Sequence, residues 1–129
     1  RNVPLALKVA PDLESRDIRD LSKAFLTEGL DALIATNTTI DRSTVADHPL
    51  QSEAGGLSGA PLTKPSTEVI AAFHSELGSK IPIIGVGGIL SAADARAKLE
   101  AGASLLQLYT GFIYRGPQLV HEILNSLPR

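Results

Sequence analysis

Cysteine, methionine and tryptophan are absent from the 129 residues, and aromatic side chains make up only 4% of them. Without cysteine the chain can form no disulfide, offers no thiolate to a metal ion and has no cysteine nucleophile, a composition that fits a reducing compartment. The net charge is only −2, so no excess of basic residues attracts nucleic acid. No apolar run reaches the roughly 18 residues of a membrane-spanning helix. We therefore expect no nucleic-acid partner and no membrane span in this chain.

Signals for metal binding and targeting are also scarce. The three histidines (His48, His74 and His121) lie far apart and lack the spacing of metal ligands, so we predict no metal site. Residues 1–4 lead directly into a predicted strand rather than into the apolar core of a signal peptide, and we expect no such signal. Hydrophobic residues make up 43% of the chain and charged residues 20%, which is typical of one compact domain.

Four short apolar runs alternate with stretches whose apolar residues recur at helical spacing. The runs predict strands at residues 5–10, 32–36, 81–85 and 104–108. The periodic stretches predict helices over residues 15–28, 66–77 and 117–127, and another from Ser91 to a stop at Gly102. A long irregular segment, about residues 40–62, separates the second strand from the second helix and has the length of a functional loop.

Helix caps and inward faces follow from the same pattern. We expect Ser66 or Thr63 to cap the second helix and Ser91 to cap the third, because hydroxyl side chains accept hydrogen bonds from the first free N–H groups of a helix. The last helix begins at a proline and is predicted to turn four apolar residues inward: Leu119, Ile123, Leu124 and Leu127.

The result is an α/β chain of four parallel βα units without an internal domain boundary. A (β/α)8 TIM barrel needs about eight strands and roughly 250 residues, so this chain has the size of half a barrel. A small open α/β sheet is the alternative. The half-barrel is favoured because the polar signals all follow strands, and the strongest pair of them matches the phosphate site that barrels build after their last two strands.

That pair consists of Gly85-Val86-Gly87-Gly88-Ile89 after the third predicted strand and Tyr109-Thr110-Gly111 after the fourth. Glycines let the backbone approach an anion closely, and backbone N–H groups and helix N-termini supply favourable partial positive charge. The two neighbouring strand ends therefore predict a phosphate-binding cup.

Lys8 is the single charged residue in the apolar run of residues 5–10. A lysine in such a run either alternates outward into solvent from an edge strand or faces an anionic partner, because an unanswered buried ammonium costs several kcal/mol. Next to a phosphate cup, the second interpretation is favoured: Lys8 faces a cofactor and supports negative charge that develops there.

Two further segments have a structural and a functional interpretation. Thr36-Asn37-Thr38-Thr39 ends the second strand with amide and hydroxyl groups, which either form a turn or recognise a ligand but cannot titrate. Gly55-Gly56-Leu57-Ser58-Gly59 is either a flexible loop or a backbone surface that lies against a flat ring.

Five segments in order resemble the C-terminal half of a dihydroorotate dehydrogenase. They are Lys8-Val9-Ala10-Pro11-Asp12-Leu13, residues 35–40, residues 55–62, residues 84–89 and residues 101–111. The Lys-x-Ala-Pro-Asp, Asn-Thr-Thr and Tyr-Thr-Gly patterns are more similar to the class 2, quinone-reducing branch than to the class 1 branch. The resemblance spans essentially the whole chain and implies a flavin mononucleotide (FMN) enzyme whose N-terminal half is absent here.

The resemblance also implies roles for individual residues. Lys8 corresponds to a lysine beside the N1/O2 edge of the FMN ring, and Thr36 and Gly59 also line the flavin site. Gly88, Tyr109 and Thr110 correspond to residues that hold the FMN phosphate. Asn37 and Thr38 correspond to residues that hydrogen-bond the pyrimidine substrate.

The implied reaction is the oxidation of dihydroorotate to orotate in pyrimidine biosynthesis, with a quinone as electron acceptor. In class 2 enzymes the base is a serine from the first half of the barrel, so we assign no catalytic base in this chain. An N-terminal extension admits the quinone and places the family peripherally on the inner membrane, at its cytoplasmic face in bacteria.

Two other functions are open on the residues alone. One is a different phosphate-binding barrel, such as an isomerase or synthase without flavin, which leaves Lys8 and the glycine-rich loop unexplained. The other is a non-catalytic half-barrel that self-associates through its two unpaired edge strands. On the flavoenzyme interpretation we expect the isolated chain to be inactive as a dehydrogenase, and an isolated chain of this length is expected to form dimers or larger assemblies.

Overall fold

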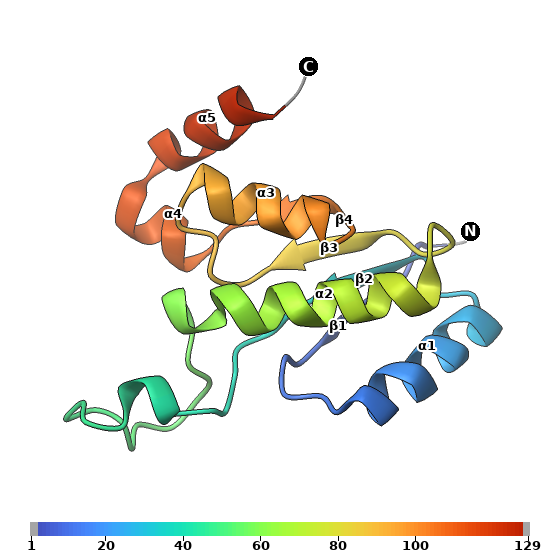
Figure 1. Cartoon of the computed structure of the whole chain (residues 1–129), viewed down its shortest axis with the longest axis horizontal. Helices are drawn as coiled ribbons and strands as arrows, with labels where there is room; N and C mark the ends of the chain where they lie inside the picture. The colour runs from blue at the N-terminus through green and yellow to red at the C-terminus, as the bar shows by residue number, and fades with distance from the viewer. Residues whose placement is uncertain (1–2, 128–129) are drawn as a thin grey trace.

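The computed structural model describes residues 3–127 and contains one four-stranded parallel sheet (Figure 1). Its strands are β1 (Ala6–Val9), β2 (Ala32–Ala35), β3 (Ile83–Val86) and β4 (Ala103–Gln107), and they are hydrogen-bonded in the order β1-β2-β3-β4. Each strand therefore lies beside the next strand in the sequence, as it does in a barrel. β1 and β4 form the two edges, as predicted.

Five helices connect or follow the strands: α1 (Ser15–Glu28), α2 (Thr63–Leu77), α3 (Ala92–Glu100), α4 (Thr110–Arg115) and α5 (Pro117–Ser126). α1 ends at Gly29, which adopts a left-handed conformation with φ of 71°. α3 begins at Ser91, whose Oγ accepts a hydrogen bond from the backbone N–H of Asp94 at 3.2 Å. The predicted cap at Ser91 is thus confirmed.

The main core lies between the sheet and helices α1 and α2. Strand side chains of one alternating set, including Val9, Leu33 and Ile83, pack there with helix residues. The rings of Phe25 in α1 and Phe73 in α2 stack with their centroids 6.1 Å apart. Residues of the other set, such as Lys8, are outside this core and more exposed, which leaves one face of the sheet free to contact other groups.

The second predicted helix starts earlier than the sequence indicated. α2 begins at Thr63, its N-cap position is Leu62, and neither Thr63 nor Ser66 caps it. Both hydroxyls lie inside the helix and hydrogen-bond carbonyl groups of the neighbouring glycine turn instead, Thr63 to Gly88 and Ser66 to Gly87. These polar contacts replaced the expected caps.

Two corrections concern the end of the chain. The short helix α4 was not predicted, and it fills the segment between β4 and α5.

Leu119 and Ile123 of α5 are buried as expected, and Leu127 packs against the same apolar cluster, but Leu124 is 62% exposed. Leu124 borders an open apolar groove between α5 and the edge strand β4, so nothing in residues 3–127 covers it.

The long segment between β2 and α2 is irregular, as predicted, apart from short 3-10 turns at Ser43–Val45 and Ala60–Leu62. In Figure 1 it reaches away from the sheet and returns to the start of α2. An antiparallel β-bridge between Thr39 and Leu57 joins its two limbs, and the guanidinium of Arg42 also donates to the carbonyl of Gly55. No helix within residues 3–127 combines the length and apolar character needed to cross a membrane.

Candidate functional site

A cavity of about 310 Å³ lies at the carboxyl ends of the strands. Its volume is within the range of small-molecule sites, and its position is the one that α/β folds use for ligands. Residues of β1, β3 and β4 and of the segments that follow β2, β3 and β4 line it. The lining comprises Lys8, Thr36, Asn37, Thr38, Ser58, Leu62, Val86, Gly87, Gly88, Ile89, Gln107, Leu108, Tyr109, Thr110 and Gly111.

The residues singled out in the sequence meet at this cavity although they are up to 102 positions apart in the chain. The set includes every predicted site residue except Gly59. Gly59 lies next to it, since a Cβ atom added there would be 3.2 Å from Cγ2 of Thr110. The fold thus brings the predicted residues together, and the role of each residue stays a prediction.

Among the described residues 3–127, Lys8 is the only one that lines the cavity with a side chain carrying a full positive charge. It lies on the edge strand β1 in register with Ile34 of β2. Within residues 3–127, no salt bridge involves Lys8. Its ammonium group is therefore available to an anionic partner in the cavity.

The end of β2 is held by polar contacts that leave an amide group available. The backbone N–H of Asn37 donates to the carbonyl of Val9 at 2.7 Å, and the Oδ1 of Asn37 accepts from the N–H of Thr38 at 2.9 Å. Thr36 is buried, and its hydroxyl donates to the carbonyl of Asn37. The peptide bond between Ala35 and Thr36 is cis. These contacts orient Asn37 while its side-chain NH₂ group can still donate to a ligand.

The turn after β3 requires glycine at Gly88. Its φ is +64°, and an added Cβ atom would lie only 2.3 Å from the backbone nitrogen of Thr63. The turn therefore packs directly on the first residues of α2. Its carbonyls receive hydrogen bonds from that helix, at 2.7 Å from Thr63 Oγ1 to Gly88 and at 3.0 Å from Ser66 Oγ to Gly87.

The segment after β4 packs equally closely on this turn. A Cβ atom added to Gly111 would lie 2.1 Å from the carbonyl oxygen of Ile89. The hydroxyl groups of Thr110 and Ser58 are 2.8 Å apart, which joins the start of α4 to the long loop. The two strand ends of the predicted phosphate cup are therefore in contact, and the loop closes over them.

The donors of this cup suit a phosphate group. Gly88 is buried and Thr110 partly buried, and within residues 3–127 neither backbone N–H has a protein acceptor. Backbone N–H groups need an acceptor, so these two can donate to a ligand or to water in the cavity. With the charge of Lys8 and the hydroxyl of Thr110, the residues present fit a phosphorylated cofactor.

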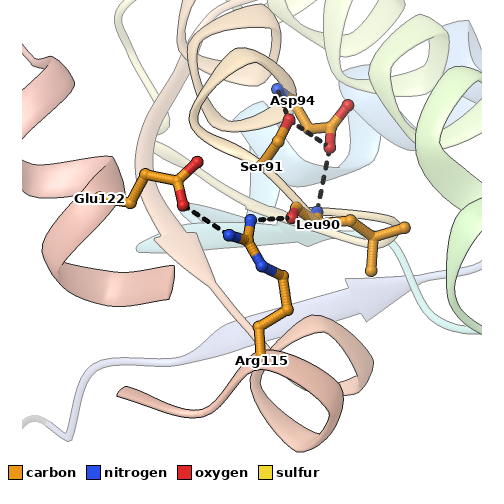
Figure 2. A network of polar contacts seen from close by, with 5 residues as sticks. All are labelled: Leu90, Ser91, Asp94, Arg115 and Glu122. Atoms are coloured by element: carbon orange, nitrogen blue, oxygen red, sulfur yellow. Dashed lines mark hydrogen bonds and ion pairs between the residues drawn. The ribbon is translucent and has the colours of Figure 1, made fainter. Parts of the chain in front are cut away.

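A network around Arg115 fastens the glycine turn to the C-terminal helices (Figure 2). The guanidinium donates to the carbonyl of Leu90 at 2.8 Å through Nη1 and to Glu122 Oε2 at 2.7 Å through Nη2. Asp94 completes the network, because its Oδ2 accepts from the N–H of Leu90 and from the hydroxyl of Ser91. Leu90, which follows the glycine turn, is thus held at its carbonyl by Arg115 and at its N–H by Asp94.

We expect Arg115→Met to lower the free energy of unfolding by about 1–2 kcal/mol, since it removes two charge-assisted hydrogen bonds of a half-exposed group. Arg16→Met is the matched control, because the Arg16–Asp20 pair is 3.7 Å long with side chains 83% and 62% exposed. Such a pair contributes less than about 0.5 kcal/mol. Denaturant unfolding measures both variants, and equal losses would contradict the role of the network.

Lys98 of α3 is fully buried and was not singled out in the sequence. Its Nζ donates to Ser66 Oγ at 2.7 Å, to Thr67 Oγ1 at 2.9 Å and to the carbonyl of Thr63 at 3.2 Å. Burial lowers the pKa of Lys98 from 10.5 to about 8, although the charge of nearby Asp94 opposes the shift. The ammonium form is thus the main species at neutral pH.

This pKa shift predicts that stability rises with pH. Between about pH 8 and 10.5, the unfolded chain binds more protons at Lys98 than the folded chain does. The contribution of Lys98 to the free energy of unfolding is therefore constant below that window and increases through it. Unfolding measured across the window should show wild type gaining stability relative to Lys98→Met. Parallel pH curves for the two proteins would show that the pKa is not shifted.

Sequence analysis missed three residues near the site: Ser58, Gln107 and Lys98. Ser58 was named only as part of the glycine-rich segment, and its contact with Thr110 joins residues 52 positions apart. Gln107 lies at the end of β4 and lines the cavity, and its position at a predicted strand end was the available signal. Nothing local marks Lys98 as buried, because α2 covers it.

Comparison with known proteins gives consistent results. A family model described as dihydroorotate dehydrogenase matches residues 1–129. The chain is 61% identical over 127 residues to a protein of Akkermansia muciniphila and 62% identical over 126 residues to one of Chromobacterium violaceum, both named dihydroorotate dehydrogenase (quinone). The alignments cover 98% of this chain but only 36% and 37% of those proteins. The chain thus spans little more than a third of the length of these curated relatives.

Two solved structures of DHODH from Eimeria tenella have the same fold over this region. The structure in complex with ferulenol has a TM-score of 0.89 and 40% identity, covering 95% of this chain and 32% of that one. The ligand-free structure has a TM-score of 0.90 and 38% identity, covering 97% and 35%. The four βα units are therefore part of a TIM barrel, which confirms the predicted fold class. Because the family match extends over all of its residues, this chain belongs to the dihydroorotate dehydrogenase family.

Proposed function

We propose that this chain, residues 1–129, is the C-terminal half-barrel of a longer FMN-dependent enzyme that oxidises dihydroorotate to orotate with a quinone as electron acceptor. The observation that carries the proposal is the convergence of Lys8, Asn37, Gly88 and Thr110 on one cavity at the carboxyl ends of the strands. The names of the relatives and their greater length support it.

In this proposal, one group of cavity residues binds the phosphate of FMN and another contacts its ring system. Gly88, Tyr109 and Thr110 bind the phosphate, through backbone N–H groups and a hydroxyl that line the cavity. Lys8, Thr36 and Gly59 contact the ring system. When bound, FMN would supply the two-electron redox chemistry between dihydroorotate and a quinone.

The residues of this chain bind and orient rather than transfer protons. The ammonium group of Lys8 stabilises negative charge at the N1/O2 edge of the ring. Such electrostatic stabilisation is strongest in a site that excludes water. The amide of Asn37 and the hydroxyl of Thr38 hydrogen-bond the pyrimidine and fix its orientation. Neither group titrates near neutral pH, so neither serves as the base that removes the C5 proton. In line with the resemblance to class 2 enzymes, we assign that base to a serine in the first half of the barrel.

The proposal places the protein in de novo pyrimidine biosynthesis, with dihydroorotate and orotate as small-molecule partners. The quinone enters through a region N-terminal to this chain, which associates peripherally with the inner membrane, at its cytoplasmic face in a bacterium. We propose no nucleic-acid partner, because the chain carries no basic excess.

The proposal is tested by purifying the full-length protein and recording its absorption spectrum and its quinone reduction with dihydroorotate. A flavin spectrum, release of FMN on denaturation and dihydroorotate-dependent quinone reduction are the expected results. A colourless protein that binds a phosphorylated metabolite and turns it over without flavin would replace the proposal with another phosphate-binding barrel enzyme.

We expect the isolated 129-residue chain to give no turnover with FMN and dihydroorotate and to self-associate. Leu105 on the edge strand β4 is 62% exposed and borders an apolar groove together with Leu124. Unpaired strand edges and exposed apolar surface favour association with a second copy. Light scattering at micromolar concentration should show a dimer or a larger assembly.

A matched pair of variants tests the cause of that association. Leu105→Lys places a charge on the edge strand and should shift the protein toward monomer. Ile40→Lys changes a residue that is 79% exposed in the long loop and should leave the assembly unchanged. A stable wild-type monomer, or robust quinone reduction by the chain alone, would contradict these expectations.

A further inference from the structure

Lys98 is a buried charge for which the proposed function has no use. It has no exposed surface, and it does not line the cavity. Its three N–H bonds meet three acceptors, all of them on the first turns of α2: Thr63 O, Ser66 Oγ and Thr67 Oγ1. None of these acceptors is a carboxylate. Because a buried ammonium group is costly without a carboxylate bound to it, its position calls for a reason other than packing.

The acceptors of Lys98 are the residues that hold the glycine turn. Ser66 accepts from Lys98 and lies 3.0 Å from the carbonyl of Gly87, to which it donates. Thr63 accepts from Lys98 through its carbonyl and donates through its hydroxyl to the carbonyl of Gly88 at 2.7 Å. Lys98 is thus linked to each carbonyl of the turn through one intervening residue, Ser66 for Gly87 and Thr63 for Gly88.

Lys98 helps to hold the Ser66 hydroxyl in the orientation from which it donates to the turn. A serine hydroxyl has one proton and can either donate it or turn it away. Since the ammonium group of Lys98 can only donate, it occupies a lone pair of Ser66 Oγ and leaves the Ser66 proton for the carbonyls of Gly87 and Leu62. Both carbonyls of the turn are engaged on the α2 side, and a trans peptide directs its N–H away from its carbonyl, so the N–H groups of Gly88 and Ile89, which line the cavity, are directed away from α2.

We propose that Lys98 is a positioning residue for phosphate binding: through Ser66 and Thr63, it fixes the Gly87–Gly88 turn so that its backbone N–H groups face an anion in the cavity. The inference rests on the proposed function, because the anion is the FMN phosphate. It assigns a role to a residue that touches neither the cofactor nor the substrate. The buried positive charge beneath the turn also favours an anion above it.

The test compares FMN with riboflavin, which has the same ring system but no phosphate. Dissociation constants of both flavins for the full-length apoprotein are measured by quenching of flavin fluorescence. Lys98→Met keeps the length of the side chain and removes its donors. We expect it to weaken FMN binding by about tenfold or more, the lower end of the cost of outer-shell substitutions at metal sites, and to leave riboflavin binding unchanged.

Two further variants separate positioning from stability. Ser66→Ala breaks the link between Lys98 and Gly87 and should also weaken FMN binding selectively. Thr67→Val removes another acceptor of Lys98 that makes no contact with the turn, so it should leave the ratio of the two affinities unchanged. Ser66→Ala carries the test if Lys98→Met does not fold.

The outcomes are distinguishable. Wild-type protein that binds FMN more tightly than riboflavin, with a ratio lowered by Lys98→Met or Ser66→Ala, supports the inference. If the variants weaken both flavins equally or change neither affinity, Lys98 does not position the turn, while the proposed function stands. Wild-type protein that binds neither flavin overturns the proposed function and the inference with it.

Discussion

Replacing Gly88 with alanine is expected to weaken FMN binding to the full-length protein by about 100-fold or more, because displacement of a binding group by about 1 Å has an effect of that size. The alanine Cβ would lie 2.3 Å from the backbone nitrogen and 2.5 Å from the Cα of Thr63. Backbone cannot move away as a flexible side chain can, so the turn itself must shift. Its N–H groups then lose their alignment with the phosphate.

The same substitution should lower the free energy of unfolding by about 3 kcal/mol or more, as the sum of left-handed strain and overpacking. Gly29→Ala is the matched control. Gly29 has a similar φ of +71°, but an added Cβ atom meets no atom of residues 3–127 within 4 Å. It should cost about 1–2 kcal/mol from strain alone and leave FMN binding unchanged. Equal effects of the two substitutions on flavin affinity would contradict the close packing of the turn.

Replacing Lys8 with methionine should reduce kcat for dihydroorotate oxidation by about 100-fold to 1,000-fold, as removal of one electrostatic stabilising group does in other enzymes. The side chain is exposed and, within residues 3–127, makes no salt bridge, so the fold does not depend on its charge. The loss should therefore appear in the rate and in a more negative reduction potential of the bound flavin, with the thermal midpoint unchanged.

Lys23→Met, on the exposed surface of α1, is the control for the loss of one positive charge and should behave as wild type. Lys8→Arg retains the charge and should recover part of the rate. A Lys8→Met enzyme with an unchanged reduction potential and full activity would show that Lys8 points into solvent, the other interpretation that its sequence position allows.

The strands and most of the helices could be predicted because the signals are local. Each strand is a short apolar run, and glycines mark the end of α1 and of the segment after α3. The candidate site followed from the parallel arrangement, since polar residues after each strand meet at one edge of the sheet. Asn37, Gly88 and Thr110 lie at the same cavity for this reason, and Lys8 lines it from within β1.

The parts that could not be predicted depend on contacts between distant residues. α4 spans only Thr110–Arg115 and ends at Gly116, so it is too short to show helical periodicity. Thr63 and Ser66 have the side chains of helix caps, but the glycine turn takes their hydroxyl groups. Lys98 resembles any exposed helix lysine until α2 packs over it. The helical pattern predicts that Leu124 faces the core, but no residue within residues 3–127 covers it.

The central claim is that the cavity at the carboxyl ends of the strands holds FMN. A crystal structure of the full-length protein purified with its flavin tests it most directly. We predict that the phosphate accepts hydrogen bonds from the backbone N–H groups of Gly88 and Thr110, and that Lys8 contacts the N1/O2 edge of the ring. A flavin bound elsewhere in the protein, with this cavity empty or filled by side chains, would contradict the account.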